Sequence, residues 1–118
     1  MKNILIVEDD AATVELLRHF LESKGLSVET ARDGLDGLEK LRKGTTPDLV
    51  VLDVMMPKLD GYSFLRELKQ DAKLRTLPVI VLSAREMMRD LFEQEGVKDF
   101  VLKPYDPAEL YKVIQKYL

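Results

Sequence analysis

The sequence predicts an α/β sandwich with a parallel sheet, on two observations. Short, continuous apolar runs rich in β-branched residues alternate with longer segments whose apolar residues recur at helical spacing. Continuous apolar runs are typical of strands that are covered on both faces, as the inner strands of a parallel sheet are. Their alternation with helical segments indicates repeated βα units.

Three apolar runs, ILIV, LVVL and VIVL, predict inner strands at residues 4–7, 49–52 and 79–82. The segment LSVETA at 26–31 alternates apolar and polar residues, which places it at an edge of the sheet. The shorter run FVL at 100–102 is flanked by charged residues, so we expect it at the other edge.

Helical periodicity between these runs predicts five helices. The last helix has the clearest start, with Asp106 as the N-cap, Pro107 at the first helical position and Glu109 at the third. Gly25 and Gly96 are expected to end two of the others. The predicted helices cover residues 11–24, 35–43, 61–71, 86–95 and 107–118.

Composition limits the class of protein. The 118 residues suit one domain, and 46% hydrophobic with 33% charged residues is ordinary for a globular protein. The net charge of −3 gives no reason to expect direct nucleic-acid binding. Without cysteine, the chain has no disulfide and no thiolate metal site. No stretch approaches the ~20 apolar residues of a membrane span, so we expect a cytoplasmic protein without membrane contact.

Polar residues follow the predicted strands at the point where each strand ends. In a parallel sheet these ends share one edge, which is where open α/β folds bind their ligands. Two carboxylates ~4 Å apart repel each other by about 4 kcal/mol at an effective dielectric constant of 20, so a cluster of them favours a cation. The residues at this edge are Glu8, Asp9, Asp10, Asp53, Ser83, Lys103 and Pro104.

This set of residues favours phosphoryl chemistry. Oxygen ligands, with no cysteine and with His19 on a helix, favour a hard ion, Mg²⁺ before Ca²⁺. Asp53 lies within an otherwise apolar run, and a carboxylate can act as a nucleophile that forms an aspartyl phosphate. Lys103 and Mg²⁺ would then neutralise the transferring group, and Ser83 would donate a hydrogen bond to it.

Four motifs, ILIVEDD, DLVVLDVMMPKLDGY, PVIVLSA and DFVLKPY, closely resemble the receiver domains of two-component response regulators, such as the chemotaxis receiver. The resemblance runs from about residue 3 to residue 117 and implies one receiver domain over 1–118. It also implies a flavodoxin-like five-stranded parallel sheet of order 2-1-3-4-5 with helices on both faces.

The resemblance assigns roles to the acidic residues. It implies that Asp53 is the phosphoacceptor and that Mg²⁺ is bound by Asp9 directly, by Glu8 through water, by Asp53 and by the backbone carbonyl of Met55. Asp10 lies one position beyond the acidic pair, so we expect it to begin the first helix.

The resemblance also assigns roles in the conformational change that follows phosphorylation in this family. Ser83 matches the family's switch hydroxyl, Lys103 its lysine, and the Lys103-Pro104 bond one that is cis in the family. Phe100 occupies the position of the aromatic rotamer switch, although plain core packing is the alternative. The 20 positions from Ser83 to Lys103 are fewer than usual in the family, which predicts a shortened or shifted fourth helix.

The implied function is a switch that catalyses only its own phosphorylation and dephosphorylation. The partners would be a histidine kinase or phosphotransfer protein and a downstream target or output domain, with a homodimer on the face of the fourth helix, fifth strand and fifth helix. We expect the chain either to act alone or to be part of a longer regulator. Val14, Leu16 and Tyr105 are candidates for a docking patch, with ordinary packing as the alternative. Gly37, inside the second helix, has no explanation in the sequence.

Two other functions remain open. An aspartate-dependent phosphatase is disfavoured because Met55 stands two residues after Asp53, where such enzymes carry an acid. A receiver-like binding module that needs no phosphorylation is disfavoured because all the expected site residues are present. Nucleotide or flavin binding lacks a glycine-rich loop after the first strand.

Overall fold

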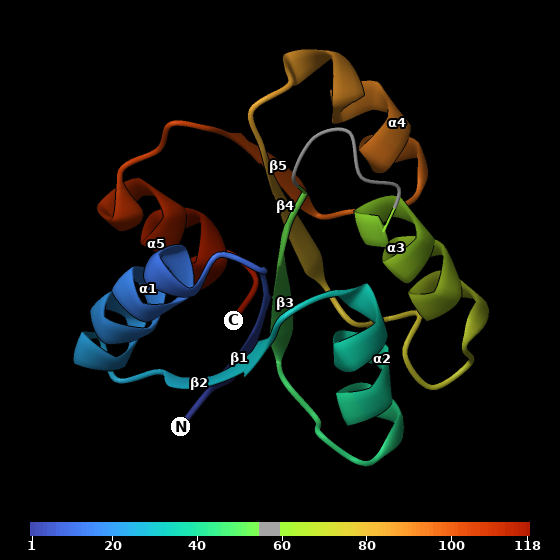
Figure 1. The fold of residues 1–118 in the computed structure, drawn as a ribbon, viewed down its shortest axis with the longest axis horizontal. Coiled ribbons are helices and arrows are strands. Elements are labelled where there is room, and N and C mark those ends of the chain that lie inside the picture. The colour runs from blue at the N-terminus through green and yellow to red at the C-terminus, as the bar shows by residue number, and fades with distance from the viewer. Residues whose placement is uncertain (55–59) are drawn as a thin grey trace.

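The computed structural model describes residues 1–54 and 60–118, the side chain of Asp60 excepted. These residues form one parallel sheet of order β2-β1-β3-β4-β5, which confirms the predicted order and both predicted edge strands (Figure 1). The strands are β1 (Asn3–Val7), β2 (Ser27–Ala31), β3 (Leu49–Asp53), β4 (Val79–Ser83) and β5 (Asp99–Leu102).

Helices cover both faces of the sheet. Helices α1 and α5 lie on one face, and α2, α3 and α4 lie on the other (Figure 1). The helices are α1 (Ala11–Ser23), α2 (Gly34–Arg42), α3 (Asp60–Gln70), α4 (Arg89–Gln94) and α5 (Pro107–Gln115), with a 3₁₀ turn at Glu86–Met88 before α4.

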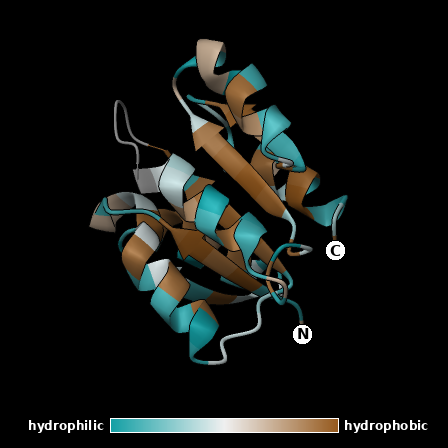
Figure 2. Ribbon diagram, turned by 90° about the vertical axis from the view of Figure 1, so that its right-hand side faces the viewer, coloured by the Kyte–Doolittle hydropathy of each residue, from teal (hydrophilic) through white to brown (hydrophobic). Residues whose placement is uncertain are grey.

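The two faces of the sheet carry two separate hydrophobic cores. Because successive strand side chains point to opposite faces, Ile4 packs with α1 and α5, whereas Leu5 packs with α2, α3 and α4. Figure 2 shows the result: the inner strands are mostly hydrophobic, whereas the helices carry both hydrophobic and hydrophilic residues. This explains why the inner strands are continuous apolar runs in the sequence.

The ends of several helices follow the sequence signals. The side chain of Asp106 accepts a hydrogen bond from the Ala108 N–H at 2.9 Å, with Pro107 at the first helical position, as predicted. Gly25 adopts a φ of 87° and Gly96 a φ of 88°, a conformation that side chains with a Cβ rarely adopt. Asp10 is the residue before α1, which confirms that it begins this helix.

The structure differs from the prediction in the fourth helix, in the end of the last helix and in the exposure of two apolar residues. The single helix expected over 86–95 is a 3₁₀ turn followed by an α4 of six residues, in agreement with a shortened fourth helix. The last helix ends at Gln115 rather than at the final residue. Leu35 and Met87, which fit the helical period, have exposed fractions of 75% and 76%, because they lie on the solvent side of short helical segments.

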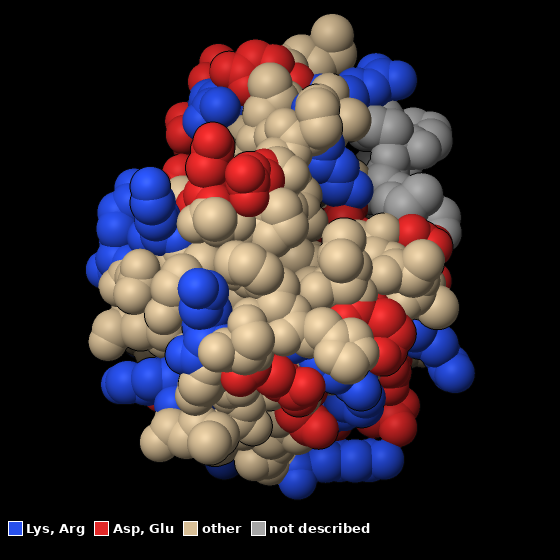
Figure 3. Space-filling model, turned by 90° about the vertical axis from the view of Figure 1, so that its left-hand side faces the viewer, with Lys and Arg blue, Asp and Glu red and all other residues tan. Residues whose placement is uncertain are grey.

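The surface has mixed charge. On the side that carries α1 and α5, acidic and basic side chains are interspersed with uncharged surface (Figure 3). In the described part of the chain, no helix has the length and apolar character needed to cross a membrane.

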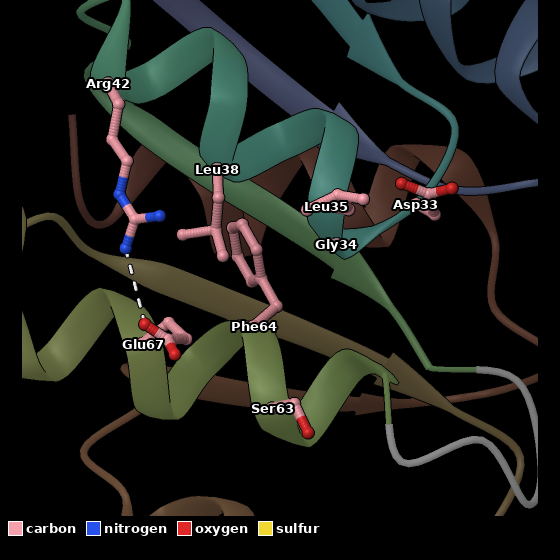
Figure 4. Close-up of a pocket in the computed structure, with 8 residues that line it drawn as sticks. All are labelled: Asp33, Gly34, Leu35, Leu38, Arg42, Ser63, Phe64 and Glu67. Carbon is pink, nitrogen blue, oxygen red and sulfur yellow. Dashed lines mark hydrogen bonds and ion pairs between the residues drawn. The ribbon is translucent and has the colours of Figure 1, made fainter.

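Gly37 allows α2 to pack closely against α3 and β1. A Cβ atom at this position would lie 3.1 Å from Cε1 of Phe64 and 3.3 Å from Cγ2 of Val7. Figure 4 shows the neighbouring contacts: Leu38 and Phe64 face each other between α2 and α3, and Arg42 pairs with Glu67 at 3.3 Å. The close approach therefore explains a glycine that the sequence left unexplained.

Candidate functional site

The register of the sheet brings the predicted polar residues to one edge. Val7 is paired with Leu52, Asp53 with Leu82, and Ser83 with Leu102. Residues at or just after these positions therefore lie on neighbouring strands at the carboxyl edge, as the sequence predicted. They are Glu8, Asp53, Ser83 and Lys103.

Asp53 and Lys103 form the central ion pair of this edge. The Lys103 Nζ lies 2.6 Å from Asp53 Oδ1, with 28% of the lysine side chain and 1% of the aspartate side chain exposed. The other oxygen, Oδ2, is buried and has no hydrogen-bond partner among the described residues. A buried carboxylate oxygen without a partner is costly, so this atom is suited to receive a ligand.

Glu8 adds a second buried carboxyl beside Asp53. The Glu8 residue is 4% exposed, and one of its oxygens accepts a hydrogen bond from the Asp10 N–H at 2.9 Å. Burial, followed by the proximity of Asp53, raises the pKa of Glu8 from 4.5 to about 8. The two carboxyls therefore resist being ionised together, which is the condition under which a bound cation is favourable.

The residues present fit a hard cation that keeps several of its waters. In the part of the chain that the structure describes, no three Asp, Glu, His or Cys side chains are grouped as a metal site. An ion here would therefore need water or backbone ligands, as Mg²⁺ commonly does. Asp9 follows Glu8 and is exposed, at the same edge of the sheet. The predicted backbone ligand, Met55, lies outside the described residues.

Ser83 and Phe100 are both inside the protein. Ser83 is fully buried, and its Oγ accepts a hydrogen bond from the Arg85 N–H at 3.0 Å, which leaves the hydroxyl proton free to donate elsewhere. The Lys103-Pro104 peptide bond is cis. Phe100 is 3% exposed, so its ring occupies the inward position.

A mostly apolar cleft of about 500 Å³ lies beside Lys103, between α1 and the segment after β5. Leu16, with 64% of its surface exposed, and Tyr105 line it. Burial, together with the charges of Asp53 and Glu8, raises the pKa of Tyr105 to about 12. Val14, by contrast, is buried, and His19 is exposed beside Glu15 at 3.8 Å.

The sequence did not predict one contact at this end of the sheet, between Arg89 and Phe100. The guanidinium of Arg89 lies over the Phe100 ring. The one sequence signal related to this contact is the spacing of Glu86 and Arg89, which suits an ion pair on a helix.

Comparison with known proteins identifies the family. The sequence model of the response regulator receiver domain matches residues 4–115. The chain belongs to the response regulator receiver family. The CpxR homolog of Haemophilus influenzae, named a transcriptional regulatory protein, is 41% identical over the whole of this receiver. The receiver spans 51% of that protein and about half the length of several other curated relatives.

Solved structures agree with this assignment. The receiver domain of a signal transduction histidine kinase from Syntrophus aciditrophicus has a TM-score of 0.88 and 38% identity, covering 100% of this chain and 90% of that one. The response regulator TrrA of Thermotoga maritima, solved in complex with Mg²⁺-BeF, has a TM-score of 0.86 and 31% identity, covering 100% of both chains. Receiver domains of this family typically bind Mg²⁺ and are phosphorylated.

Proposed function

We propose that this receiver accepts a phosphoryl group on Asp53, with Mg²⁺, from a histidine kinase or a histidine phosphotransfer protein. The observation that carries the proposal is the state of Asp53, a buried carboxylate with one oxygen paired to Lys103 and the other without a hydrogen-bond partner among the described residues. The complex of TrrA with Mg²⁺-BeF supports the choice of metal. The chain has no cysteine, which is compatible with the reducing cytoplasm, where we place this activity.

The transfer is a displacement at phosphorus. An oxygen of Asp53 attacks the phosphorus atom, the bond from phosphorus to the donor imidazole nitrogen breaks, and that nitrogen keeps the electron pair. Lys103 neutralises negative charge at the carboxylate, and the Ser83 hydroxyl donates to a phosphoryl oxygen. Mg²⁺, held by Asp53, by Asp9 and through water by Glu8, would supply further charge neutralisation.

Phosphorylation would change partner binding by shifting an existing equilibrium. Ser83 and Lys103 would move toward the phosphoryl group, and Phe100 would be held inward. The readout would be altered affinity for a downstream target or output domain, or formation of a homodimer, on the α4–β5–α5 face.

Uptake of a phosphoryl group from a small donor tests the proposal. With acetyl phosphate and Mg²⁺, mass spectrometry of the intact receiver should show a gain of about 80 Da, the mass of one phosphoryl group. The gain should be strongly reduced when EDTA removes the metal, because the charge on the transferring group is then poorly neutralised. An unchanged mass in the presence of Mg²⁺ would reject the proposal.

The cleft beside Lys103 is the proposed docking site for the protein donor. An exposed apolar side chain at Leu16, in a cleft that Lys103 also lines, suits the helix of a donor that must bring its histidine to Asp53. Leu16→Asp should slow transfer from a histidine kinase or phosphotransfer protein, because a charged side chain would replace the apolar contact with the donor helix. We expect an effect of roughly tenfold or more, which corresponds to about 1.4 kcal/mol of binding free energy. Uptake from acetyl phosphate should not change.

Leu35→Asp is the matched control for this prediction. Leu35 is an equally apolar, exposed leucine on α2, away from the cleft. Equal transfer rates for the Leu16 and Leu35 variants would place the docking site elsewhere.

A further inference from the structure

Phe100 is enclosed between a buried ring and a surface arginine. On its inner side the Phe92 ring lies at 6.3 Å between centroids, with the two planes tilted by 38°. On its outer side the guanidinium carbon of Arg89 lies 4.9 Å from the Phe100 centroid, within the range of a cation–π contact. Arg89 Nη1 also donates to the Phe100 carbonyl oxygen at 3.4 Å. Rotation of the ring outward would have to displace this arginine.

Glu86 fixes the plane of the Arg89 guanidinium. Arg89 Nε donates to Glu86 Oε1 at 2.8 Å, and Arg89 Nη2 donates to Glu86 Oε2 at 3.0 Å. Two parallel hydrogen bonds to one carboxylate define the orientation of the planar guanidinium group. A further acid, Glu93, lies 3.8 Å from Nη1. The Arg89 hydrogen bonds also lower the pKa of Glu86, so the pair stays charged at neutral pH.

The same turn is tied to the phosphorylation site. The Arg85 N–H donates to the Ser83 hydroxyl, and Arg85 is the N-cap of the 3₁₀ turn that carries Glu86. Arg89 is the first residue of α4, directly after this turn. A short chain of contacts therefore leads from the Ser83 hydroxyl through Glu86 and Arg89 to the Phe100 ring.

We propose that the Glu86–Arg89 ion pair is a clamp that holds Phe100 inside the receiver and couples its position to the Ser83 hydroxyl. Arg89 is then a positioning residue of the switch. With the clamp in place, Phe100 is 3% exposed. The coupling to Ser83 rests on the proposed function: when Ser83 moves to donate its proton to a phosphoryl oxygen, its Oγ still accepts from the Arg85 N–H, so the turn that carries Glu86 moves with it and shifts the Arg89 guanidinium over the Phe100 ring.

The first test needs no phosphorylation. A soluble gadolinium chelate enhances the relaxation of ring protons that approach solvent, and NMR resolves this for Phe100 in the full chain. In Arg89→Ala we expect the enhancement at Phe100 to rise severalfold over that of the unmodified protein. Arg89→Lys keeps the positive charge but loses the planar guanidinium group. In this variant the relaxation enhancement at Phe100 should rise only partly. Protection of Phe100 that is the same in all three proteins would overturn the clamp.

Arg66→Ala is the matched control. Arg66 also lies over an aromatic ring, that of Tyr62 at 5.8 Å, and pairs with an acid, Glu95 at 3.8 Å, but it belongs to α3. Its replacement should leave the protection of Phe100 unchanged. A rise equal to that in Arg89→Ala would show that loss of any stacked arginine loosens the core, and would also overturn the clamp.

The second test follows the coupling. After addition of acetyl phosphate and Mg²⁺, Arg89→Ala should still gain one phosphoryl group, because Arg89 does not contact Asp53 in the described structure. The phosphoryl-dependent change in the Phe100 ring resonances should be at least halved in this variant. An undiminished change would reject the coupling to Ser83. Absence of phosphoryl uptake in the unmodified protein would reject the proposed function instead, while the relaxation test would still decide the clamp.

Discussion

Asp53→Asn should abolish phosphoryl uptake from acetyl phosphate, so that the mass gain of about 80 Da disappears completely. An amide oxygen is a far weaker nucleophile than a carboxylate, and it cannot carry the acyl linkage that the transfer forms. The loss should be complete because Asp53 is the buried carboxylate that pairs with Lys103 at the centre of the site. Intact-mass spectrometry, with and without Mg²⁺, measures it.

Asp90→Asn is the control for this substitution. Asp90 lies on α4 and is exposed, so its replacement removes the same charge without touching the site. This variant should keep the full mass gain. If Asp53→Asn still gained the phosphoryl group, another residue would be the acceptor, and the assignment of Asp53 would be wrong.

Glu8→Gln should stabilise the receiver in the absence of divalent cations, and increasingly so as the pH rises. The folded-state pKa of Glu8 is raised to about 8, above the 4.5 of the ordinary carboxyl. The folded state therefore binds more protons than the unfolded state between these values, and stability is lost as the pH rises toward 8. Each pH unit in this window costs about 1.4 kcal/mol at most, and glutamine, which stays neutral, avoids the cost.

The measurement is urea denaturation in EDTA between pH 5 and pH 9. The free energy of unfolding of Glu8→Gln should exceed that of the unmodified protein by roughly 2–5 kcal/mol at the alkaline end and by little near pH 5. Added Mg²⁺ should stabilise the unmodified protein more than the variant, because the variant has lost a carboxylate of the site.

Glu22→Gln removes an exposed glutamate from α1 and serves as the control. Its effect should stay within about 0.5 kcal/mol across the range. If the difference in unfolding free energy between Glu8→Gln and the unmodified protein did not vary with pH, the pKa of Glu8 would not be raised in the folded state.

The electrostatic strain and the function have one origin. Glu8 and Asp53 lie close together at the carboxyl edge of the sheet, so burial and Asp53 raise the pKa of Glu8, and we expect the folded receiver to be less stable without a cation. The same arrangement would favour a bound cation such as Mg²⁺, and it leaves Asp53 Oδ2 without a hydrogen-bond partner among the described residues. Sites that bind charge are commonly built at the expense of stability.

The sequence by itself determined the order of elements and the composition of the site edge. Apolar runs, N-caps such as Asp106 and stops such as Gly25 are local signals, since they depend on residues that are close in the chain. The placement of Asp53, Ser83 and Lys103 also followed from the sequence, because the ends of parallel strands must share an edge. The order of the strands was correctly implied by the family resemblance.

Only the tertiary structure decided which side chains are buried and what they contact. It placed Val14 in the interior and Leu16 at the surface, although both are apolar and lie on one helix. It also showed the narrow space at Gly37, the raised pKa of Glu8 and the arginine over Phe100. These properties depend on distances between residues far apart in the chain, and on the water that packing removes, which no local pattern in a sequence records.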